Sequence, residues 1–374
     1  MAFTRWMSMW GAPWYGWASH LFRALTTRLK KQRGIYYIIE SRDWSIRRDG
    51  EVIIGNLRRL QPQIPCAITT TSKWLHHQVI HFGSIWCFVA NIKQTHRSNR
   101  LVVSVFHGHE GIGPETQQAW KTLRRYLPRL DAVVTASTLM QARLQAWGMP
   151  NEKLHVIPIG VDLQLFRPTS PEHRVHQRRR LGIPDGVICI GSFQKDGVGW
   201  GEGLEPKLVK GPDIFLETVR RLSMSYPIFV LLTGPARGYI KRGLEASGIP
   251  YRHDYIREFN ELPSYYHCLD LYIVASREEG GPKALPECMA TGVPLISTRV
   301  GMAPDIIKHG VNGLLANSED ADGLAEAASR LIEDVDLRCR IVENALKTVQ
   351  EYDWSLVSQR YYKNVYAPIL RQGN

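Results

Sequence analysis

The chain alternates short apolar runs with amphipathic stretches, and this alternation restricts the folds open to it. Runs rich in β-branched and aromatic residues predict strands in the first half at 3–10, 35–40, 66–71, 101–107 and 132–137. Apolar residues at helical spacing predict helices at 17–31, 72–79, 115–127 and 138–147. Strands that alternate with helices are typical of a parallel sheet covered on both faces.

The second half repeats the pattern. Strands are predicted at 187–192, 228–234, 271–276, 294–300 and 313–316. Helices are predicted at 212–224, 236–246, 261–268, 283–291, 320–333 and 336–350. Because a single core rarely grows beyond about 250–300 residues, a chain of 374 residues is expected to form two domains. The sequence therefore predicts an α/β protein with two Rossmann-like parallel-sheet domains.

The boundary between the domains is expected in HVIPIGVDLQLFRP, residues 155–168, which mixes a short apolar run with Pro and Gly. We assign 1–158 to an N-terminal domain and 159–354 to a C-terminal domain. Apolar residues at helical spacing continue over 353–368, and 355–374 is expected to return to the first domain as a helix. Ligands of open parallel sheets bind beyond the carboxyl ends of the strands, so functional residues are expected in loops that follow strands.

Positive charge is concentrated in the first half. Residues 1–160 carry 21 Lys and Arg against 8 Asp and Glu, whereas residues 161–374 carry 26 against 27. A basic half suits nucleic acid, an anionic membrane surface or a phosphate-bearing substrate, and is also compatible with a solvated surface that has no special partner. Residues 17–33 combine cationic side chains with tryptophan, and we expect this face to make peripheral contact with an anionic membrane.

Several features indicate a cytoplasmic protein. No apolar run approaches the roughly 20 residues of a membrane-spanning helix. The N-terminus has no clean apolar stretch followed by a small-residue cleavage site, so no secretory signal is predicted. The six cysteines lack zinc or redox spacing and are expected to be reduced thiols. Membrane contact is therefore expected to be peripheral, on the inner face.

The most informative stretch is SREEGGPKALPECMATGVPLIST, residues 276–298, which begins where a predicted strand ends. Gly280 and Gly281 let the backbone come close to a ligand. Free N–H groups at the start of the following helix favour phosphate. Glu279 at the mouth of the turn can accept hydrogen bonds from sugar hydroxyls, and Glu287 in the helix can accept two from a ribose diol.

Two prolines bear on how this helix is presented. Pro282 is interpreted as the helix start, where a missing N–H costs nothing. Pro286 stands immediately before Glu287, and in a helix interior it would remove a hydrogen bond and clash with the preceding turn. If the helix starts later than Pro282, Pro286 falls within its first turn and this strain shrinks.

Seven residues separate the two glutamates, in a pattern that resembles the signature of the retaining glycosyltransferases of the GT-B fold, in particular the large family four. The chain matches this signature at Glu279, Gly280, Glu287, Met289, Ala290, Gly292 and Pro294. VGMAPDIIKHGVNGLLA (300–316) resembles the segment that follows in that family, and VIPIGVDLQLFRP (156–168) resembles its interdomain linker. The resemblance is strong over 150–335 and loose over 1–149, and it implies two domains that face each other across a cleft.

The resemblance assigns roles to residues of the second domain. Glu279 would contact the transferred sugar, and Glu287 the ribose of the nucleotide. The family has a basic pair that neutralises the pyrophosphate of the donor, and its lysine stands before a glycine that opens a helix. Lys210 in KGPDIFLETVRRL matches this lysine.

The second member of the basic pair departs from the family pattern. It is usually an arginine directly after the glycine that ends a strand, but here Gly191 is followed by Ser192. Lys195 is the nearest basic residue, and we assign the role to it. Arg237 in GPARG, at the end of another predicted strand, is a further candidate for holding phosphate. The Gly-rich loop 196–209 is interpreted either as a mobile flap or as a plain surface loop.

In the first domain, VFHGHEG follows a predicted strand. His107 matches the family position whose imidazole faces the sugar near the reacting carbon, and His109 is the alternative. The loop GAPWYGWAS resembles the glycine-rich loop that lies near the donor phosphates and the acceptor in that family. Gly11 and Gly16 are the matching positions.

The resemblance implies a hexosyltransferase that retains anomeric configuration and uses a nucleotide-diphosphate sugar, in polysaccharide, glycolipid or glycoconjugate synthesis. No metal or other cofactor is predicted. We expect Lys210, Lys195 and the N–H groups of Gly280 and Gly281 to stabilise the leaving nucleotide diphosphate. No nucleophilic carboxylate is evident, so front-face attack by the acceptor hydroxyl is expected, with the leaving phosphate as base.

Three alternatives remain open on the sequence. A nucleotide-sugar epimerase on the same fold would convert its donor without any acceptor. A non-enzymatic nucleic-acid-binding protein is suggested by the basic half and by HRVHQRRR, residues 173–180, although that run also suits a solvated segment. The missing arginine at Ser192 allows an inactive relative that binds the donor. A carbohydrate or lipid-linked acceptor is the expected partner, and nucleic acid is not.

Overall fold

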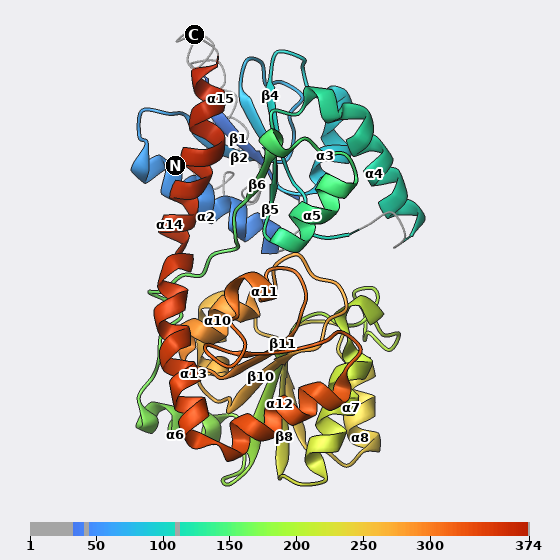
Figure 1. Cartoon of the computed structure of the whole chain (residues 1–374), viewed down its shortest axis with the longest axis vertical. Coiled ribbons are helices and arrows are strands. Elements are labelled where there is room, and N and C mark those ends of the chain that lie inside the picture. Colours follow the sequence, from blue (N-terminus) through green and yellow to red (C-terminus); the bar gives the residue numbers. More distant parts are fainter. Residues whose placement is uncertain (1–32, 41–44, 109–112, 373–374) are drawn as a thin grey trace, which may run out of the picture.

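The computed structural model describes residues 33–40, 45–108 and 113–372, which form two α/β domains (Figure 1). The first domain contains a six-stranded parallel sheet in the order β2-β1-β3-β4-β5-β6. Its strands are β1 Ile35–Ile38, β2 Cys66–Thr69, β3 Val79–Phe82, β4 Arg100–Ser104, β5 Ala132–Thr135 and β6 Leu154–Val156. Its helices are α2 Ser45–Leu60, α3 Ile85–Asn91, α4 Pro114–Tyr126 and α5 Thr138–Ala146.

The second domain contains another six-stranded parallel sheet, in the order β12-β11-β10-β7-β8-β9. Its strands are β7 Ile188–Phe193, β8 Ile228–Thr233, β9 Tyr251–Asp254, β10 Leu271–Val274, β11 Leu295–Thr298 and β12 Leu314–Ala316. Its helices are α6 Pro171–Arg180, α7 Pro212–Ser223, α8 Gly238–Ala246, α9 Leu262–Tyr266, α10 Ala284–Thr291, α11 Ala303–Ile306, α12 Ala321–Glu333 and α13 Val335–Thr348. The predicted fold, two parallel-sheet α/β domains, is confirmed.

Burial on both faces explains why the strands appear in the sequence as continuous apolar runs. In β1, Tyr36 and Ile38 join the cluster that includes α3, α4 and α5 residues. Ile35 and Tyr37 point the other way, into the cluster with α2 and the C-terminal helices. Successive strand residues alternate between faces, so helices on both sides demand apolar side chains at every position.

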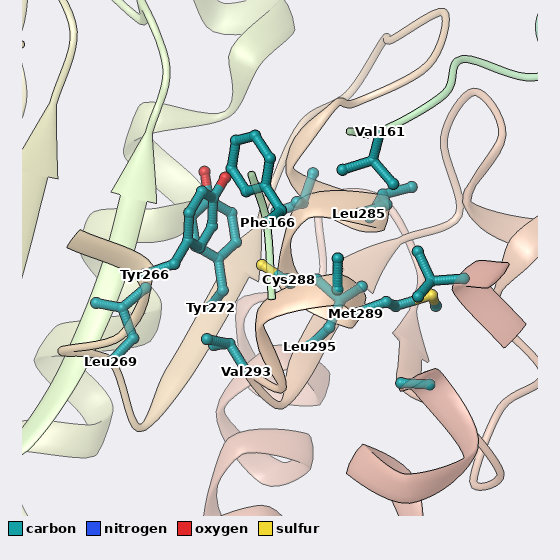
Figure 2. Packing of buried hydrophobic residues seen from close by; sticks show 14 of the residues in the cluster. Val161, Phe166, Tyr266, Leu269, Tyr272, Leu285, Cys288, Met289, Val293 and Leu295 are labelled. Atoms are coloured by element: carbon teal, nitrogen blue, oxygen red, sulfur yellow. The ribbon is translucent and has the colours of Figure 1, made fainter. Parts of the chain in front are cut away.

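The core of the second domain fixes the helix that follows β10. Leu285, Cys288 and Met289 on α10 are fully buried. Figure 2 shows Cys288 beside Tyr266 from α9 and Tyr272 from β10, and Leu285 near Val161 in the same cluster. Because this helix is anchored by apolar contacts along its length, any polar side chain on it is held in a defined position.

The C-terminal helices return to the first domain, as predicted. α14 (Trp354–Tyr361) and α15 (Ala367–Arg371) continue the red column that climbs one side of the molecule from α13 (Figure 1). The amide of Asn56 on α2 donates to the carbonyl of Trp354 and to the Ser358 hydroxyl, both at 3.0 Å. The exact domain limits stay a prediction.

Some elements differ from those predicted. The helix expected at 72–79 is wrong: turns occupy this segment, and β3 begins at Val79. The helices α2, α3, α6 and α11 and the strands β3, β6 and β9 were not among the predicted elements. β9 is a half-exposed edge strand of polar sequence, so it lacks an apolar run. The predicted strand at 3–10 and the predicted helix at 17–31 both lie outside the described residues.

A buried polar contact ties the C-terminus to the first sheet and makes a prediction about acid stability. His81 on β3 is fully buried; its Nδ1 lies 2.5 Å from the Tyr366 hydroxyl and its Nε2 lies 2.9 Å from the Ser104 hydroxyl. Burial lowers the pKa of His81 to about 3. The folded state therefore holds this imidazole neutral, while the unfolded chain binds a proton near its ordinary pKa.

The stability contributed by neutral His81 is complete above a pH of about 6.5 and is lost as the pH falls towards about 3, at up to about 1.4 kcal/mol per pH unit. We expect His81→Gln to be less stable than the parent protein at neutral pH but to lose less stability on acidification. Urea unfolding at pH 7 and at pH 5 measures both slopes. Equal losses in the two proteins would contradict this assignment.

Candidate active site

The loop after β10 carries Glu279 to the junction of the domains. Lys210 Nζ lies 2.5 Å from Glu279 Oε1, and the hydroxyl of Ser276 donates to the same oxygen at 3.1 Å. Glu279 Oε2 accepts no hydrogen bond from the residues that the structure describes. One carboxylate oxygen is thus held by the protein, whereas the other has no donor among the described residues.

A glycine lets Lys210 reach this carboxylate. Gly211 has a φ of +61°, and a Cβ there would lie 1.9 Å from the carbonyl oxygen of Ala275. A side chain is excluded by both the backbone conformation and the contact. Gly211 therefore brings the end of the 207–210 turn directly against the end of β10, and α7 begins at the next residue, Pro212.

Arg277 joins the two loops that carry Lys210 and Glu279. Its guanidinium forms two hydrogen bonds of 2.7 Å with the carboxylate of Asp213, and it donates to the carbonyl of Leu208 at 2.8 Å. The hydrogen bonds from Arg277 lower the pKa of Asp213. The N–H groups of Arg277 and Glu278 also donate to the carbonyl of Val209. No local sequence pattern indicates this brace, because it links residues more than sixty positions apart.

A cluster of lysines lies beside the contact between Lys210 and Glu279. It consists of Lys195, Lys207 and Lys210. Burial lowers the pKa of Lys207, the charges of Lys210 and Lys195 lower it further, and Glu279 opposes them. Burial also lowers the pKa of Lys195, whose Nζ lies 4.6 Å from the centroid of the Trp200 ring. A bound anion would offset this concentration of positive charge. Lys207 is not among the residues predicted from the sequence, although it stands three residues before Lys210.

The loop 196–209 is built as a hairpin docked on the second domain. Its two arms exchange backbone hydrogen bonds, from Val198 N–H to Glu205 O at 2.9 Å and from Lys207 N–H to Asp196 O at 2.7 Å. At its tip, Gly203 packs so closely on Ala236 that a Cβ would lie 2.2 Å from the alanine carbonyl oxygen. The hairpin therefore presents Lys207 from a defined base.

Arg237, predicted to hold phosphate, has other partners in the structure. Its side chain is fully buried, and its Nε lies 3.0 Å from Asp196 Oδ1. It also donates to the carbonyls of Ser192, Gln194 and Thr233 at 2.6–2.8 Å. Because these contacts occupy the guanidinium, the structure does not favour a direct contact with phosphate. Arg237 instead supports the end of β7 and the base of the hairpin.

Glu287 lies in the first turn of α10. It is buried, and the Tyr266 hydroxyl donates to its Oε2 at 2.7 Å. Burial raises the pKa of Glu287, opposed by the Tyr266 hydrogen bond and the charge of Lys283. The helix begins at Ala284 rather than at Pro282. Pro286 therefore falls within the first turn, where it does not break the helix.

The glycines of the signature make contact between the domains. A Cβ on Gly280 would lie 2.6 Å from the carbonyl oxygen of Phe106 in the first domain. One on Gly281 would lie 2.7 Å from Ile159 Cδ1 in its own domain and 3.3 Å from Ala136 Cβ in the first domain. Close packing against neighbouring residues therefore requires glycine at these two positions. The predicted close approach of a ligand to them stays a prediction. Within the described part of the chain, no acceptor is present for the N–H group of either glycine.

His107 follows β4 and reaches the same junction from the first domain. Its side chain is exposed to solvent. Desolvation of its ring by neighbouring protein atoms nevertheless lowers its pKa, the charge of Lys210 lowers the pKa further, and Glu279 acts in the opposite direction. The structure therefore brings His107, Lys210 and Glu279 together. Gly11, Gly16 and His109 lie outside the described residues.

A second contact between the domains lies beside Glu287. Lys283 Nζ is 2.5 Å from Oδ1 of Asp49, which is buried on α2. The guanidinium of Arg48 lies 4.4 Å from the centroid of the Phe259 ring. Both α2 residues act electrostatically on Glu287. The first domain thus approaches both predicted donor-binding glutamates.

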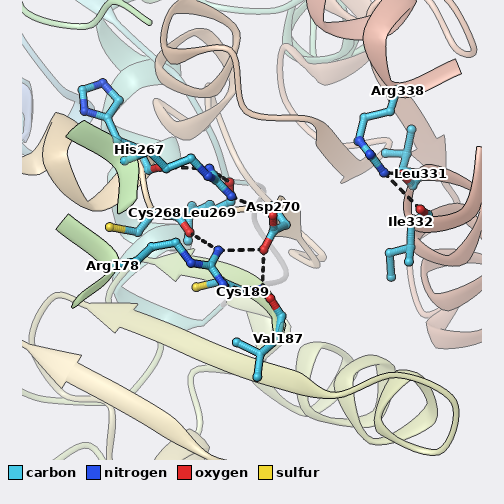
Figure 3. A network of polar contacts seen from close by, with 11 residues as sticks. Arg178, Val187, Cys189, His267, Cys268, Leu269, Asp270, Leu331, Ile332 and Arg338 are labelled. Carbon is cyan, nitrogen blue, oxygen red and sulfur yellow. Dashed lines mark hydrogen bonds and ion pairs between the residues drawn. The ribbon is translucent and has the colours of Figure 1, made fainter. Parts of the chain in front are cut away.

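The basic run 173–180 forms α6, and two of its arginines are used within the second domain. Arg174 and Arg178 donate to the carboxylate of Asp270 at 2.7 Å and 2.9 Å. Figure 3 shows Arg178 also reaching the carbonyl of Cys268, and its other nitrogen donates to Val187 O at 2.9 Å. These two arginines fasten α6 to the sheet, so their charges give no support to a nucleic-acid surface.

Neither a metal centre nor a membrane span is found among the residues described. No group of three or more His, Cys, Asp or Glu side chains in 33–40, 45–108 and 113–372 is arranged to hold a metal ion. Likewise, no helix in these ranges is both long and apolar enough to cross a bilayer.

The raised pKa of Glu287 predicts how its replacement affects stability. A carboxyl whose pKa is higher in the folded state stabilises the protein fully below its ordinary pKa, and this contribution is lost as the pH rises through the folded value. Glu287→Gln keeps an oxygen for the Tyr266 hydroxyl and removes the ionisation. Melting temperatures at pH 5 and pH 8 should show the variant gaining on the parent protein at the higher pH. A deficit of equal size at both pH values would contradict this prediction.

Comparison with known protein families supports the fold and the signature together. The sequence pattern described as "Glycosyl transferases group 1" matches residues 204–348, which include Lys207, Lys210 and both glutamates. The pattern described as "Glycosyltransferase Family 4" matches residues 19–165 of the first domain. The two patterns match different domains and together cover most of the chain.

The curated relatives that match this chain are also named as sugar transferases. A D-inositol 3-phosphate glycosyltransferase of Xylanimonas cellulosilytica is 28% identical over 239 residues, covering 60% of this chain and 54% of the relative. The lipopolysaccharide core biosynthesis mannosyltransferase LpsB of Rhizobium meliloti is 27% identical over 216 residues, covering 55% and 56%. The chain spans about half the length of the curated relatives that it matches.

Solved structures show the same architecture. Anabaena Alr3699/HepE, crystallised with UDP-glucose, superposes with a TM-score of 0.73 at 19% identity, covering 90% of this chain and all of that one. A glycosyltransferase from Rickettsia africae ESF-5 gives a TM-score of 0.68 at 16% identity, covering 91% and 98%. The superposition on these structures establishes the GT-B fold. Because family patterns match both domains, the chain belongs to glycosyltransferase family four, the group 1 glycosyltransferases.

Proposed function

We propose that this chain is a retaining glycosyltransferase that moves a sugar from a nucleotide-diphosphate sugar to an acceptor hydroxyl. The observation that carries the proposal is the meeting of three groups at the domain junction. Glu279 and Lys210 come from the second domain, and His107 comes from the first. Membership of family four supports the reaction class, since members of that family retain anomeric configuration.

The donor would lie along the loops of the second domain. In this proposal Glu287 binds the ribose, and the free oxygen of Glu279 accepts a hydrogen bond from the transferred sugar. The lysine cluster, Lys195, Lys207 and Lys210, faces the diphosphate between them. The crystals of Anabaena Alr3699/HepE hold UDP-glucose, so UDP-sugars are the first donors to test.

In this proposal the site stabilises the negative charge that develops on the leaving diphosphate. Fixed cations in a partly desolvated site stabilise such charge without reorganising during the reaction. The bond between the anomeric carbon and the diphosphate oxygen breaks on the face where the acceptor oxygen attacks. The acceptor proton passes to the departing phosphate oxygen. His107, whose pKa is lowered, remains neutral and accepts or donates a hydrogen bond at the sugar without adding positive charge.

An epimerase remains the second candidate, because a donor site of this kind would also serve a reaction without an acceptor. Incubation with a nucleotide sugar alone distinguishes the two: an epimerase converts the sugar while it stays attached to the nucleotide. The approach of the first domain to both glutamates favours transfer, because it provides a second surface on which an acceptor can bind.

The acceptor is proposed to be a carbohydrate or a lipid-linked molecule, with the basic first domain in peripheral contact with an anionic membrane. The uneven charge supports this proposal, although most of the 17–33 segment lies outside the described residues. Sedimentation with vesicles should show binding to anionic lipid that weakens with salt, and little binding to neutral lipid. Equal sedimentation with both lipids would exclude the electrostatic contact.

The assignment of Glu279 predicts a loss of transfer without a loss of fold. Glu279→Gln keeps an oxygen for the Lys210 and Ser276 contacts but removes the negative charge next to the sugar. We expect release of nucleoside diphosphate to fall by about 10²-fold or more, with a melting temperature close to that of the parent. A fully active variant would overturn the site.

The lysine cluster predicts that replacing Lys210 lowers kcat more than replacing Lys207. Lys210→Ala should lower kcat by about 10²-fold, as loss of one preorganised group at developing charge usually does, and Lys207→Ala by about tenfold. Lys347, an exposed lysine that pairs with Glu343 on α13, provides the matched control. Initial rates of nucleoside diphosphate release measure all three. If Lys207→Ala behaves like Lys347→Ala, Lys207 does not contact the diphosphate.

A further inference from the structure

Two loops from different domains cross at the proposed reaction centre. In the first domain, His107 stands between Phe106 and Gly108; in the second, Glu279 stands between Glu278 and Gly280. The carbonyl of Phe106 packs on Gly280, where a Cβ would lie 2.6 Å from its oxygen. The N–H of Gly108 donates to Glu278 Oε1 at 3.2 Å. Both neighbours of His107 therefore contact the neighbours of Glu279.

An arginine from a third segment closes this crossing. Arg143 on α5 donates to Glu278 Oε1 at 2.6 Å and to Oε2 at 3.3 Å. The same guanidinium donates to the carbonyl of Gly108 at 3.0 Å. The N–H and the C=O of Gly108 are thus both bonded, one to Glu278 and the other to Arg143. We call Gly108, Arg143 and Glu278 the clasp.

The ion pair of the clasp is partly shielded from water. The side chains of Arg143 and Glu278 are 38% and 18% exposed. Burial raises the pKa of Glu278, but the hydrogen bonds from Arg143 and Gly108 and the charge of Arg143 outweigh it, so the pKa is below its ordinary value. Glu278 is therefore ionised near neutral pH, and the clasp does not depend on a proton.

α5 is fastened to the second domain at two points. In its first turn, the N–H of Thr138 donates to Asp305 Oδ2 at 2.9 Å, and the Thr138 hydroxyl bonds the other carboxylate oxygen. In its second turn, Arg143 makes the clasp. Since both bonds join the two domains, they exist only when the domains are together. The clasp thus links the contact between the domains to Gly108, the residue next to His107.

We propose that Arg143 and Glu278 are positioning residues that hold His107 opposite Glu279 when the two domains close. Neither residue is assigned a contact with the donor. The inference rests on the proposed function, because it concerns the two groups that act on the sugar there. A displacement of about 1 Å at a reacting centre can cost about 10²-fold in rate, so loss of the clasp is expected to act on the chemical step.

The chain offers a well-matched control for this test. Arg100 and Asp131 form an ion pair of 3.0 Å within the first domain, with side chains 35% and 14% exposed. Its burial is similar to that of the clasp pair. The Arg100→Ala variant therefore shows what the loss of a comparable ion pair does to folding and activity.

The experiment compares kcat, donor KM and melting temperature for Arg143→Ala, Arg143→Lys, Glu278→Gln and Arg100→Ala. We expect kcat to fall at least about tenfold in Arg143→Ala and Glu278→Gln, while the donor KM changes by less than about threefold. Arg143→Lys keeps the charge but not the forked geometry and should recover part of the loss. Arg100→Ala should keep kcat near that of the parent.

The outcomes separate the clasp from the proposed function. A parent protein that transfers no sugar from any nucleoside diphosphate sugar would overturn the function and this inference with it. An active parent with an Arg143→Ala variant as active as Arg100→Ala would overturn the inference alone, as would a loss confined to KM. If Arg143→Ala fails to fold, Arg143→Lys and Glu278→Gln decide the question by the same split between kcat and KM.

Discussion

The site depends on the close contact between the turn that ends in Gly211 and the end of β10. No side chain fits at position 211, since a Cβ would meet the Ala275 carbonyl oxygen at 1.9 Å. Arg277 then reaches back across this contact to Asp213 and to the Leu208 carbonyl, which locks the two loops together. Because the lysine and the glutamate sit on loops joined in this way, their 2.5 Å contact is fixed by the protein itself.

The departure of this chain from the family pattern has a structural counterpart. The family arginine expected after Gly191 is replaced by Ser192, and the hydroxyl of Ser192 accepts a hydrogen bond from Arg237 at 3.0 Å. That arginine is paired with buried Asp196, so it adds no free positive charge. In our proposal the charge is supplied instead by Lys195 and by the hairpin, which presents Lys207 beside Lys210. The unusual loop 196–209 would then compensate for the missing arginine.

Patterns within one segment predicted much of the fold, whereas contacts between distant segments could not be predicted. The apolar runs of β7, β8, β10 and β11 are visible because strands buried on both faces need apolar residues throughout. α2 contains two glycines; one of them, Gly50, is needed because a Cβ would lie 2.7 Å from the Tyr37 ring. The contact between Gly50 and Tyr37 is visible only in the folded structure, so the sequence pattern of α2 did not predict a helix. Glu279 and Lys210 followed from a family signature, but Arg143 and Arg277 carry no local signal, since their roles depend on partners in other loops.

The central claim is that the second domain binds a nucleoside diphosphate through one lysine cluster beside Glu279. Calorimetric titration of the full chain with UDP, UMP and the diphosphates of the other nucleosides tests it most directly. We expect the preferred nucleoside diphosphate to bind at least about tenfold more tightly than its monophosphate, corresponding to about 1.4 kcal/mol, and Lys207→Ala to reduce this difference in affinity. Equal affinity for monophosphate and diphosphate, or binding of neither, would contradict it.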